Sequence, residues 1–171
     1  MKKLTVKVFI DGSNIYFAQK KMGKWLDWVK VKHYLEKTYN VLEIRYYVGV
    51  RKNDEIIQPF LRKLAKIGFT LFRKSVKIIV DETGRTIEKA NFDVEITGDI
   101  LNETEKVDAL VLFSGDSDFE YLVKLLHQKG KQLFVYSSKK TLSWELKLSA
   151  DKCYLLEELS DLTKEKQFVK L

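Results

Sequence analysis

Apolar residues recur along this chain with two spacings, one typical of strands and the other of helices. Six segments are β-branched, aromatic or alternately apolar and predict strands: residues 4–14, 41–50, 69–74, 109–114, 132–138 and 153–157. Six more carry apolar residues at helical spacing and predict helices: residues 15–21, 28–39, 54–68, 91–104, 118–130 and 141–151. Strand and helix alternate almost throughout, so the pattern predicts a three-layer α/β/α fold with a mostly parallel central sheet.

Two further segments complete the expected organisation. Residues 76–89 alternate about Asp81-Glu82-Thr83-Gly84 and predict a β-hairpin that projects from the sheet. A length of 171 residues suits one domain with a full core. We therefore expect a domain over residues 1–160, followed by a basic tail over residues 161–171.

Composition narrows the class of protein. Lys and Arg number 31 against 24 Asp and Glu, which gives a formal charge of +7 and suits a polyanionic partner. No apolar stretch approaches membrane-spanning length, and no signal peptide is recognisable at the N-terminus. Cys153 is the single cysteine, so an internal disulfide is excluded and a zinc site is not supported. These features favour a cytoplasmic protein that does not contact a membrane.

Two predicted strands end in acidic turns. Asp11 ends the first in "FIDGSN", and Asp116 and Asp118 follow the buried strand in "LFSGDSD". Ligands of open α/β sheets bind outside the carboxyl ends of the strands, so these carboxylates converge if the two strands are neighbours. Asp93 opens a predicted helix, and Asp99 lies nearly two helical turns farther along, on roughly the same side.

Carboxylates in one cluster repel one another unless protons or cations neutralise them. The cluster contains no His, so the natural counter-charge is a hard cation with oxygen ligands, Mg²⁺ or Mn²⁺. Such a site suits hydrolysis of a phosphodiester by a metal-activated water. A purely structural role for these residues is an equally sound explanation, because Asp and Ser are typical of turns and helix caps. We expect Ser117 or Asp118 to cap the helix that begins at Phe119.

Several rival chemistries lack a required residue. Ser13 stands where a haloacid-dehalogenase-type phosphatase has its second Asp, and Ile15 stands where a metal-dependent adhesion site has Ser. No glycine-rich phosphate loop is present, so a nucleotide cofactor is not supported. Ser114-Gly115 lacks the pattern of a nucleophile elbow, which argues against serine hydrolysis.

Three blocks, "FIDGSNIYF", "KANFDVEITGDIL" and "LVLFSGDSDFEYLVKLLHQKGKQLFVY", resemble the signatures of NYN domains in the LabA-like branch of the PIN-like nuclease superfamily. The later "LSWELKLSADKCYLLEEL" resembles the closing segment of that family. The resemblance spans about residues 5–160 and implies a PIN-like fold with a metal-dependent ribonuclease site.

The resemblance also assigns roles to residues. It implies that the catalytic and metal-binding carboxylates are Asp11, Asp93, Asp116 and Asp118, with Asp99 as a further metal ligand. It implies that Asn14, Ser114 and Ser117 contact the substrate or shape the turn. One departure concerns the second block, where the family usually has Gly between its Lys and Asp. Here Ala90, Asn91 and Phe92 precede Asp93 and put its orientation in question.

Basic and aromatic residues near the same sheet edge are candidate contacts for single-stranded RNA. We expect the substrate-binding residues to be Lys24, Arg51, Lys89 and Lys139, with Trp25 as a stacking platform. For any one lysine, a solvated surface position is the more common explanation. Three alternatives remain open: a non-catalytic RNA-binding or regulatory module, a phosphatase or DNA nuclease on the same site, and a homo-oligomer that pairs through the hairpin.

Overall fold

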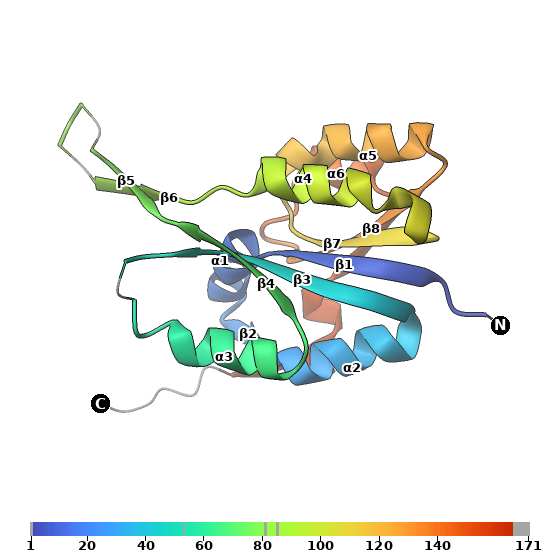
Figure 1. Cartoon of the computed structure of the whole chain (residues 1–171), viewed down its shortest axis with the longest axis horizontal. Coiled ribbons are helices and arrows are strands. Elements are labelled where there is room, and N and C mark those ends of the chain that lie inside the picture. Colours follow the sequence, from blue (N-terminus) through green and yellow to red (C-terminus); the bar gives the residue numbers. More distant parts are fainter. Residues whose placement is uncertain (1, 53, 81, 85, 166–171) are drawn as a thin grey trace.

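A computed structural model describes residues 2–52, 54–80, 82–84 and 86–165 of the chain. Its centre is a sheet of six parallel strands in the order β4-β3-β1-β7-β8-β9 (Figure 1). The strands are β1 (Thr5–Asp11), β3 (Asn40–Val50), β4 (Thr70–Ser75), β7 (Ala109–Phe113), β8 (Gln132–Ser137) and β9 (Lys152–Leu155). The predicted α/β fold with a parallel sheet is confirmed.

Helices cover both faces of the sheet (Figure 1). One face packs on α1 (Gly12–Met22), α2 (Trp28–Thr38) and α3 (Gln58–Lys66). The other packs on α4 (Asp93–Asn102), α5 (Glu120–Gln128) and α6 (Trp144–Ser149). Each face of the sheet has its own apolar core: the first lies under α1, α2 and α3, and the second under α4, α5 and α6. In β1 the predicted alternation is present, since Val8 and Ile10 lie in the first core and Phe9 lies in the second.

The order of the strands places a ligand site at one point of the sheet edge. The chain leaves β1 towards β3 on one side and leaves β7 towards β8 on the other. β1 and β7 are paired neighbours, with Ile10 opposite Phe113 at their carboxyl ends. Their carboxyl ends therefore form the topological switch point, where open parallel sheets bind ligands.

Among the predicted boundaries that differ from the structure, the start of α3 and the end of the domain change the architecture most. Helix α3 begins at Gln58, not at residue 54, because Pro59 suits a first helical turn and Ile56 is 92% exposed. Lys24–Leu26 forms β2, which pairs with β10 (Thr163–Glu165), so part of the predicted tail is a strand. Residues 166–171 lie outside the described part.

The predicted hairpin is present as β5 (Lys77–Val80) and β6 (Thr86–Lys89), an antiparallel pair that extends from the sheet (Figure 1). Asp81 and Arg85 of its turn lie outside the described residues. Within the described ranges, no helix has the length and apolarity that crossing a membrane requires.

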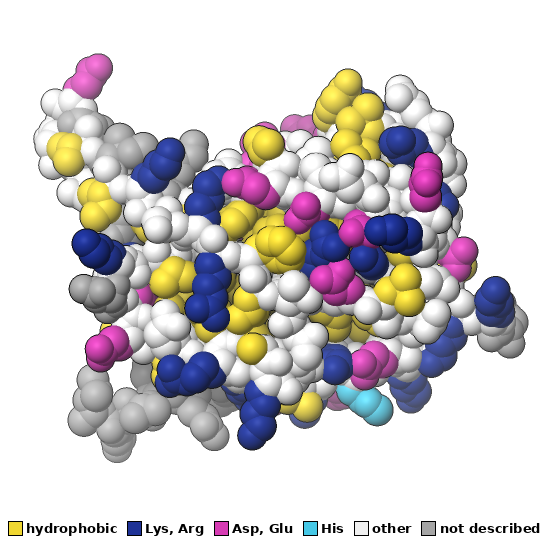
Figure 2. Space-filling view, in the orientation of Figure 1, with side chains coloured by type: hydrophobic (Ala, Val, Ile, Leu, Met, Phe, Trp, Pro, Cys, Tyr) yellow, Lys and Arg dark blue, Asp and Glu magenta, His cyan; other side chains and the backbone are white. Residues whose placement is uncertain are grey.

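Charged residues on the sheet itself hold the far end of α4. Arg45 and Lys7 each contact Glu43 and Glu103, with Nζ of Lys7 2.8 Å from Oε2 of Glu103. Figure 2 shows acidic and basic side chains interspersed over the face that it views, so the excess of +7 does not form one continuous basic patch there.

Candidate active site

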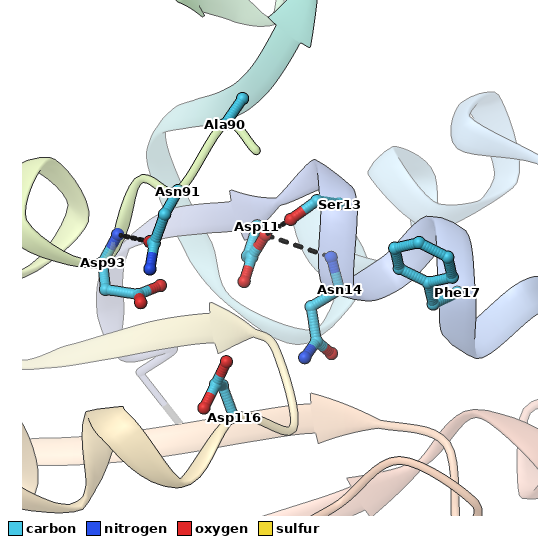
Figure 3. A pocket seen from close by; sticks show the side chains of 8 residues that line it. All are labelled: Asp11, Ser13, Asn14, Phe17, Ala90, Asn91, Asp93 and Asp116. Carbon is cyan, nitrogen blue, oxygen red and sulfur yellow. Dashed lines mark hydrogen bonds between the residues drawn. The ribbon is translucent and has the colours of Figure 1, made fainter. Parts of the chain in front are cut away.

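Three carboxylates meet at the switch point. Asp11 ends β1, Asp116 follows β7, and Asp93 is the first residue of α4. Figure 3 shows their carboxylate groups pointing towards one another. They line a pocket of about 280 Å³ whose lining residues are Asp11, Ser13, Asn14, Phe17, Ala90, Asn91, Asp93 and Asp116.

Asp11 is the most buried of the three, with 5% of its surface exposed. Its Oδ1 accepts hydrogen bonds from the backbone N–H of Asn14 (3.1 Å) and the hydroxyl of Ser13 (2.9 Å). The first of these bonds caps helix α1. Its Oδ2 accepts from the hydroxyl of Ser114 (3.2 Å), across the strand pair. The carboxylate is therefore fixed by the turn that it terminates.

Asn14 and Ser114 tie the two strand ends together. The backbone N–H of Gly115 donates to Oδ1 of Asn14 (2.9 Å), and the hydroxyl of Ser114 accepts from the N–H of Asp116 (3.3 Å). Ser114 is fully buried, whereas Asn14 is half-buried and reaches the pocket. Both residues therefore set the geometry of Asp11 and Asp116.

The turn after β7 carries two carboxylates, Asp116 and Asp118, which differ in their contacts and exposure. Oδ1 of Asp116 accepts from the N–H of Asp118 (3.1 Å) and caps the 3-10 turn Ser117–Phe119, which leads into α5. Ser117 or Asp118 was the predicted cap, and this prediction is wrong, because the 3-10 turn begins at Ser117, three residues before the regular helix α5, and Asp116 caps that turn. Asp118 and Ser117 are exposed and do not line the pocket.

The unusual neighbours of Asp93 hold it at the pocket. Oδ1 of Asn91 accepts from the N–H of Asp93 (2.8 Å), and Phe92 is 6% exposed in the second core. A Cβ on Gly49 would lie 2.4 Å from Cβ of Ala90, so the two residues fit only because position 49 is glycine. The departure "KANFD" therefore keeps Asp93 in the acidic cluster.

Lys74 secures the same segment from β4. Its Nζ donates to the carbonyl of Asn91 (3.0 Å) and to the carboxylate of Glu95, and it lies 5.4 Å from the ring centroid of Phe92. These contacts surround the residues on either side of Asp93. Lys74 was not among the predicted site residues, since nothing in its local sequence connects β4 with α4.

Negative charge accumulates in the pocket. Burial raises the pKa of Asp11, against hydrogen bonds from Asn14, Ser13 and Ser114 that lower it, and the charge of Asp116 raises it further. Burial also raises the pKa of Asp93, and so do the charges of Asp11, Asp116 and Asp118. The groups are close enough to repel one another, which is the electrostatic condition that a bound cation relieves.

The donor set fits a hard divalent cation. It consists of carboxylate, amide and hydroxyl oxygens, which Mg²⁺ and Mn²⁺ prefer. Among the described residues, no three His, Cys, Asp or Glu side chains are gathered closely enough to hold one ion as they stand. Mg²⁺ requires only one or two protein carboxylates and keeps several waters, so the pocket meets its needs without a closed cage.

Asp99 lies away from the pocket. Its Oδ2 accepts from the hydroxyl of Tyr47 (2.6 Å) and lies 3.6 Å from Nη1 of Arg45. Six residues advance a helix by roughly 600°, so Asp99 is about 120° round the axis of α4 from Asp93, not on the same side. Its contacts anchor α4 to the sheet.

The predicted basic contacts are dispersed. Lys24 is exposed on β2, and Arg51 lines a second hollow beside the acidic pocket. The backbone N–H of Lys139 donates to both carboxylate oxygens of Glu157 (3.0 Å each). Lys89 ends β6, and its side chain lies outside the described part.

The sequence did not identify Ser13, Phe17 and Asn91 as residues that line the pocket, although the first two lie within the block "FIDGSNIYF".

Sequence and structure comparisons find known proteins that are similar to this chain. The family model of the NYN domain matches residues 5–157. The chain is 33% identical over 156 residues to the low amplitude and bright protein LabA of Synechococcus elongatus, covering 89% of this chain and 83% of that protein. The crystal structure of a protein of unknown function from Vibrio parahaemolyticus superposes with a TM-score of 0.79 at 25% identity, covering 95% of this chain and 97% of the other.

Proposed function

The chain belongs to the NYN domain family and has its nuclease-like PIN fold, and from this premise we propose that it is a metal-dependent ribonuclease. The observation that carries the proposal is the convergence of Asp11, Asp93 and Asp116 in one pocket at the switch point. The pKa values of Asp11 and Asp93, raised first by burial and then by acidic neighbours, and an all-oxygen donor set support a role for Mg²⁺ or Mn²⁺. The proposed substrate is RNA, and the proposed location is the cytoplasm.

The proposed hydrolysis gives each pocket residue a distinct role. Asp11 and Asp116 would hold the cation, because their caps fix each side chain in one orientation. When bound there, the cation lowers the pKa of a coordinated water and neutralises charge on the phosphate. Asp93 has a pKa raised by burial and by its acidic neighbours, so its carboxylate is suited to accept a proton from the attacking water. Asn14 and Ser114 keep the two carboxylate-bearing turns in register.

The experiment compares Asp116→Asn with Asp108→Asn on a panel of labelled RNA strands in Mn²⁺. Asp108 is a matched control, because it precedes β7 at the opposite end of the same strand and its Oδ2 accepts from the N–H of Thr5 (2.7 Å), as an amide oxygen also can. Substitution of even an outer partner of a metal ligand costs about 10–100-fold in activity, so Asp116→Asn should lose roughly 100-fold or more. Asp108→Asn should cleave like the wild type.

A second readout is independent of cleavage. Mn²⁺ should raise the thermal stability of the wild type and of Asp108→Asn, and it should not raise that of Asp116→Asn. Equal cleavage of RNA by Asp116→Asn and the wild type would contradict the proposal that Asp116 holds the catalytic cation. DNA strands and phosphomonoesters in the same panel test the nuclease and phosphatase alternatives.

One observation favours a second candidate, an RNA-binding module without catalysis. The sequence carries a formal charge of +7, which attracts a polyanion whether or not the carboxylates hold a metal. That candidate predicts salt-sensitive RNA binding, no cleavage in any metal, and no stabilisation by Mn²⁺. A homo-oligomer that pairs through the hairpin stays a prediction, for which the mass of the protein in solution is the test.

A further inference from the structure

A larger groove opens directly beside the acidic pocket. Its volume is about 770 Å³, against about 280 Å³ for the pocket. It lies between α1, β2, the carboxyl end of β3 and the start of α3. The two hollows share Ser13, Phe17 and Ala90 as lining residues. A strand whose phosphate lies at the carboxylates therefore has a direct continuation into the groove.

The floor of the groove is aromatic and fixed. Trp28 and Tyr46 line it and are only 5% and 4% exposed. Their ring centroids are 5.3 Å apart in an edge-to-face arrangement, within the core of the first face of the sheet. Rings held in a core do not reorient when a ligand arrives, so the floor is preformed.

The rim is apolar and open to solvent. Tyr16 and Phe17 are 48% and 56% exposed, and their ring centroids are 5.6 Å apart. Tyr16 also lies 5.6 Å from the ring of Trp25, and Ile56 is 92% exposed. Large apolar side chains gathered around a hollow typically mark a binding site, whereas scattered ones need no explanation.

Charge selects the kind of ligand. Among the described residues, Arg51, Lys63 and Lys164 line the groove together with one acidic residue, Asp54. Nζ of Lys164 also lies 3.5 Å from Oδ2 of Asp27, a residue that does not line the groove. The groove thus combines aromatic faces with an excess of cations. An apolar peptide would use only the first of these properties, whereas a nucleic acid strand uses both.

We propose that this groove binds unpaired bases of the substrate strand, next to the phosphate held at the carboxylates. The bases stack on Tyr16 and its ring neighbours, and the cationic lining contacts the adjoining phosphates. The proposal rests on the proposed function, and it adds a requirement for single-stranded substrate on that side, because paired bases cannot offer their faces to the groove.

The test measures binding in EDTA, where no metal-dependent cleavage takes place. A fluorescent RNA 12-mer, the same sequence within a blunt duplex, and an abasic strand of equal charge are titrated by anisotropy. Wild type is compared with Tyr16→Ala and with Tyr16→Phe, which keeps the ring. Tyr121→Ala is the matched control, because Tyr121 is 66% exposed on α5 and lies outside the groove.

We expect Tyr16→Ala to weaken binding of the single strand about 10-fold or more, the usual cost of losing one stacking platform. Tyr16→Phe and Tyr121→Ala should bind like the wild type, and the duplex and the abasic strand should bind more weakly. Ile56→Ser, at a position too exposed to affect folding, should also weaken binding. Equal affinity of wild type, Tyr16→Ala and Ile56→Ser would overturn the proposal, and so would equal affinity for the abasic strand.

Failure of this inference is distinguishable from failure of the proposed function. Cleavage in Mn²⁺ that neither Tyr16→Ala nor Ile56→Ser changes would overturn the groove and leave the ribonuclease intact. Ring-dependent binding without cleavage would support the groove and contradict the ribonuclease. Tryptophan fluorescence that responds to an apolar peptide, with no response to any strand, would assign the groove to a protein partner instead.

Discussion

Replacing Gly115 with alanine tests whether the ends of β1 and β7 work as one unit. Gly115 lies between the buried Ser114 and the pocket-lining Asp116. Its N–H donates to Oδ1 of Asn14 (2.9 Å), and its carbonyl accepts from the N–H of Ser143 (2.8 Å). One residue therefore joins the first turn of α1, which follows β1, to the end of β7 and to the segment that leads into α6.

The structure gives the size of the perturbation. A Cβ at position 115 would lie 2.3 Å from the carbonyl oxygen of Thr141 and 2.5 Å from the hydroxyl oxygen of Ser137. The first contact is with backbone, so a side-chain rotation cannot relieve it. Overpacking of this kind costs about 1–3 kcal/mol in the free energy of unfolding. For a chain of this size, that corresponds to a decrease in Tm of roughly 2–12 °C.

The assay is thermal and denaturant-induced unfolding with and without saturating Mn²⁺. Gly98→Ala is the matched control, because Gly98 lies within α4 and a Cβ there meets nothing within 4 Å. That variant should gain about 0.5–1 kcal/mol from the better helix propensity of alanine. Gly115→Ala should lose stability and should also lose the increment that Mn²⁺ gives the wild type, because the turn that carries Asp116 must shift.

A Gly115→Ala protein as stable as the wild type would show that the turn has room for a Cβ. A variant that is destabilised yet gains as much stability from Mn²⁺ as the wild type does would show that the position of Asp116 does not depend on Gly115. The second result would separate the packing of the turn from the position of Asp116.

Two further predictions concern Asp93. Lys74→Met should cost about 1 kcal/mol in unfolding free energy and lower the stabilisation by Mn²⁺, whereas Lys74→Arg should restore both, because the lost contacts hold the segment of Asp93. Burial and acidic neighbours raise the pKa of Asp93 above the ordinary 3.8, so the folded state keeps a proton that the unfolded state has released. The metal-free protein should therefore lose stability as pH rises above that value, and Asp93→Asn should reduce this slope in denaturant titrations. An unchanged slope in the variant would contradict the assignment.

The sequence predicts the parts of the fold that local pattern determines. The apolar run before Ser114 is β7, buried on both faces, and the turn that follows it carries Asp116. Its neighbour could not be read from the pattern, because the pairing of β1 with β7 depends on contacts about a hundred residues apart. The same holds for β2 and β10, which are three residues each and too short to show a period.

Asp99 shows where the resemblance and local geometry diverge. The resemblance of the second block to the family predicts that Asp99 is a metal ligand, and a spacing of nearly two helical turns predicts that it lies on roughly the same side as Asp93. The actual rotation places Asp99 against Arg45 and Tyr47, where it anchors α4. Its effect on Asp93 is through the position of the helix, which no spacing rule reveals.

Capping is compatible with the proposed metal binding in this pocket, because the two use different lone pairs. Asp11 and Asp116 each accept a backbone N–H at Oδ1, and a carboxylate offers about four acceptor sites over its two oxygens. The caps restrict the rotamers, and even Asp11, which also accepts from the hydroxyls of Ser13 and Ser114, keeps about one of its four acceptor sites for the proposed cation. A residue that terminates a strand in this way is already oriented as a ligand. The turn chemistry of "DGSN" and "SGDSD" is thus the means by which the sheet edge presents its carboxylates.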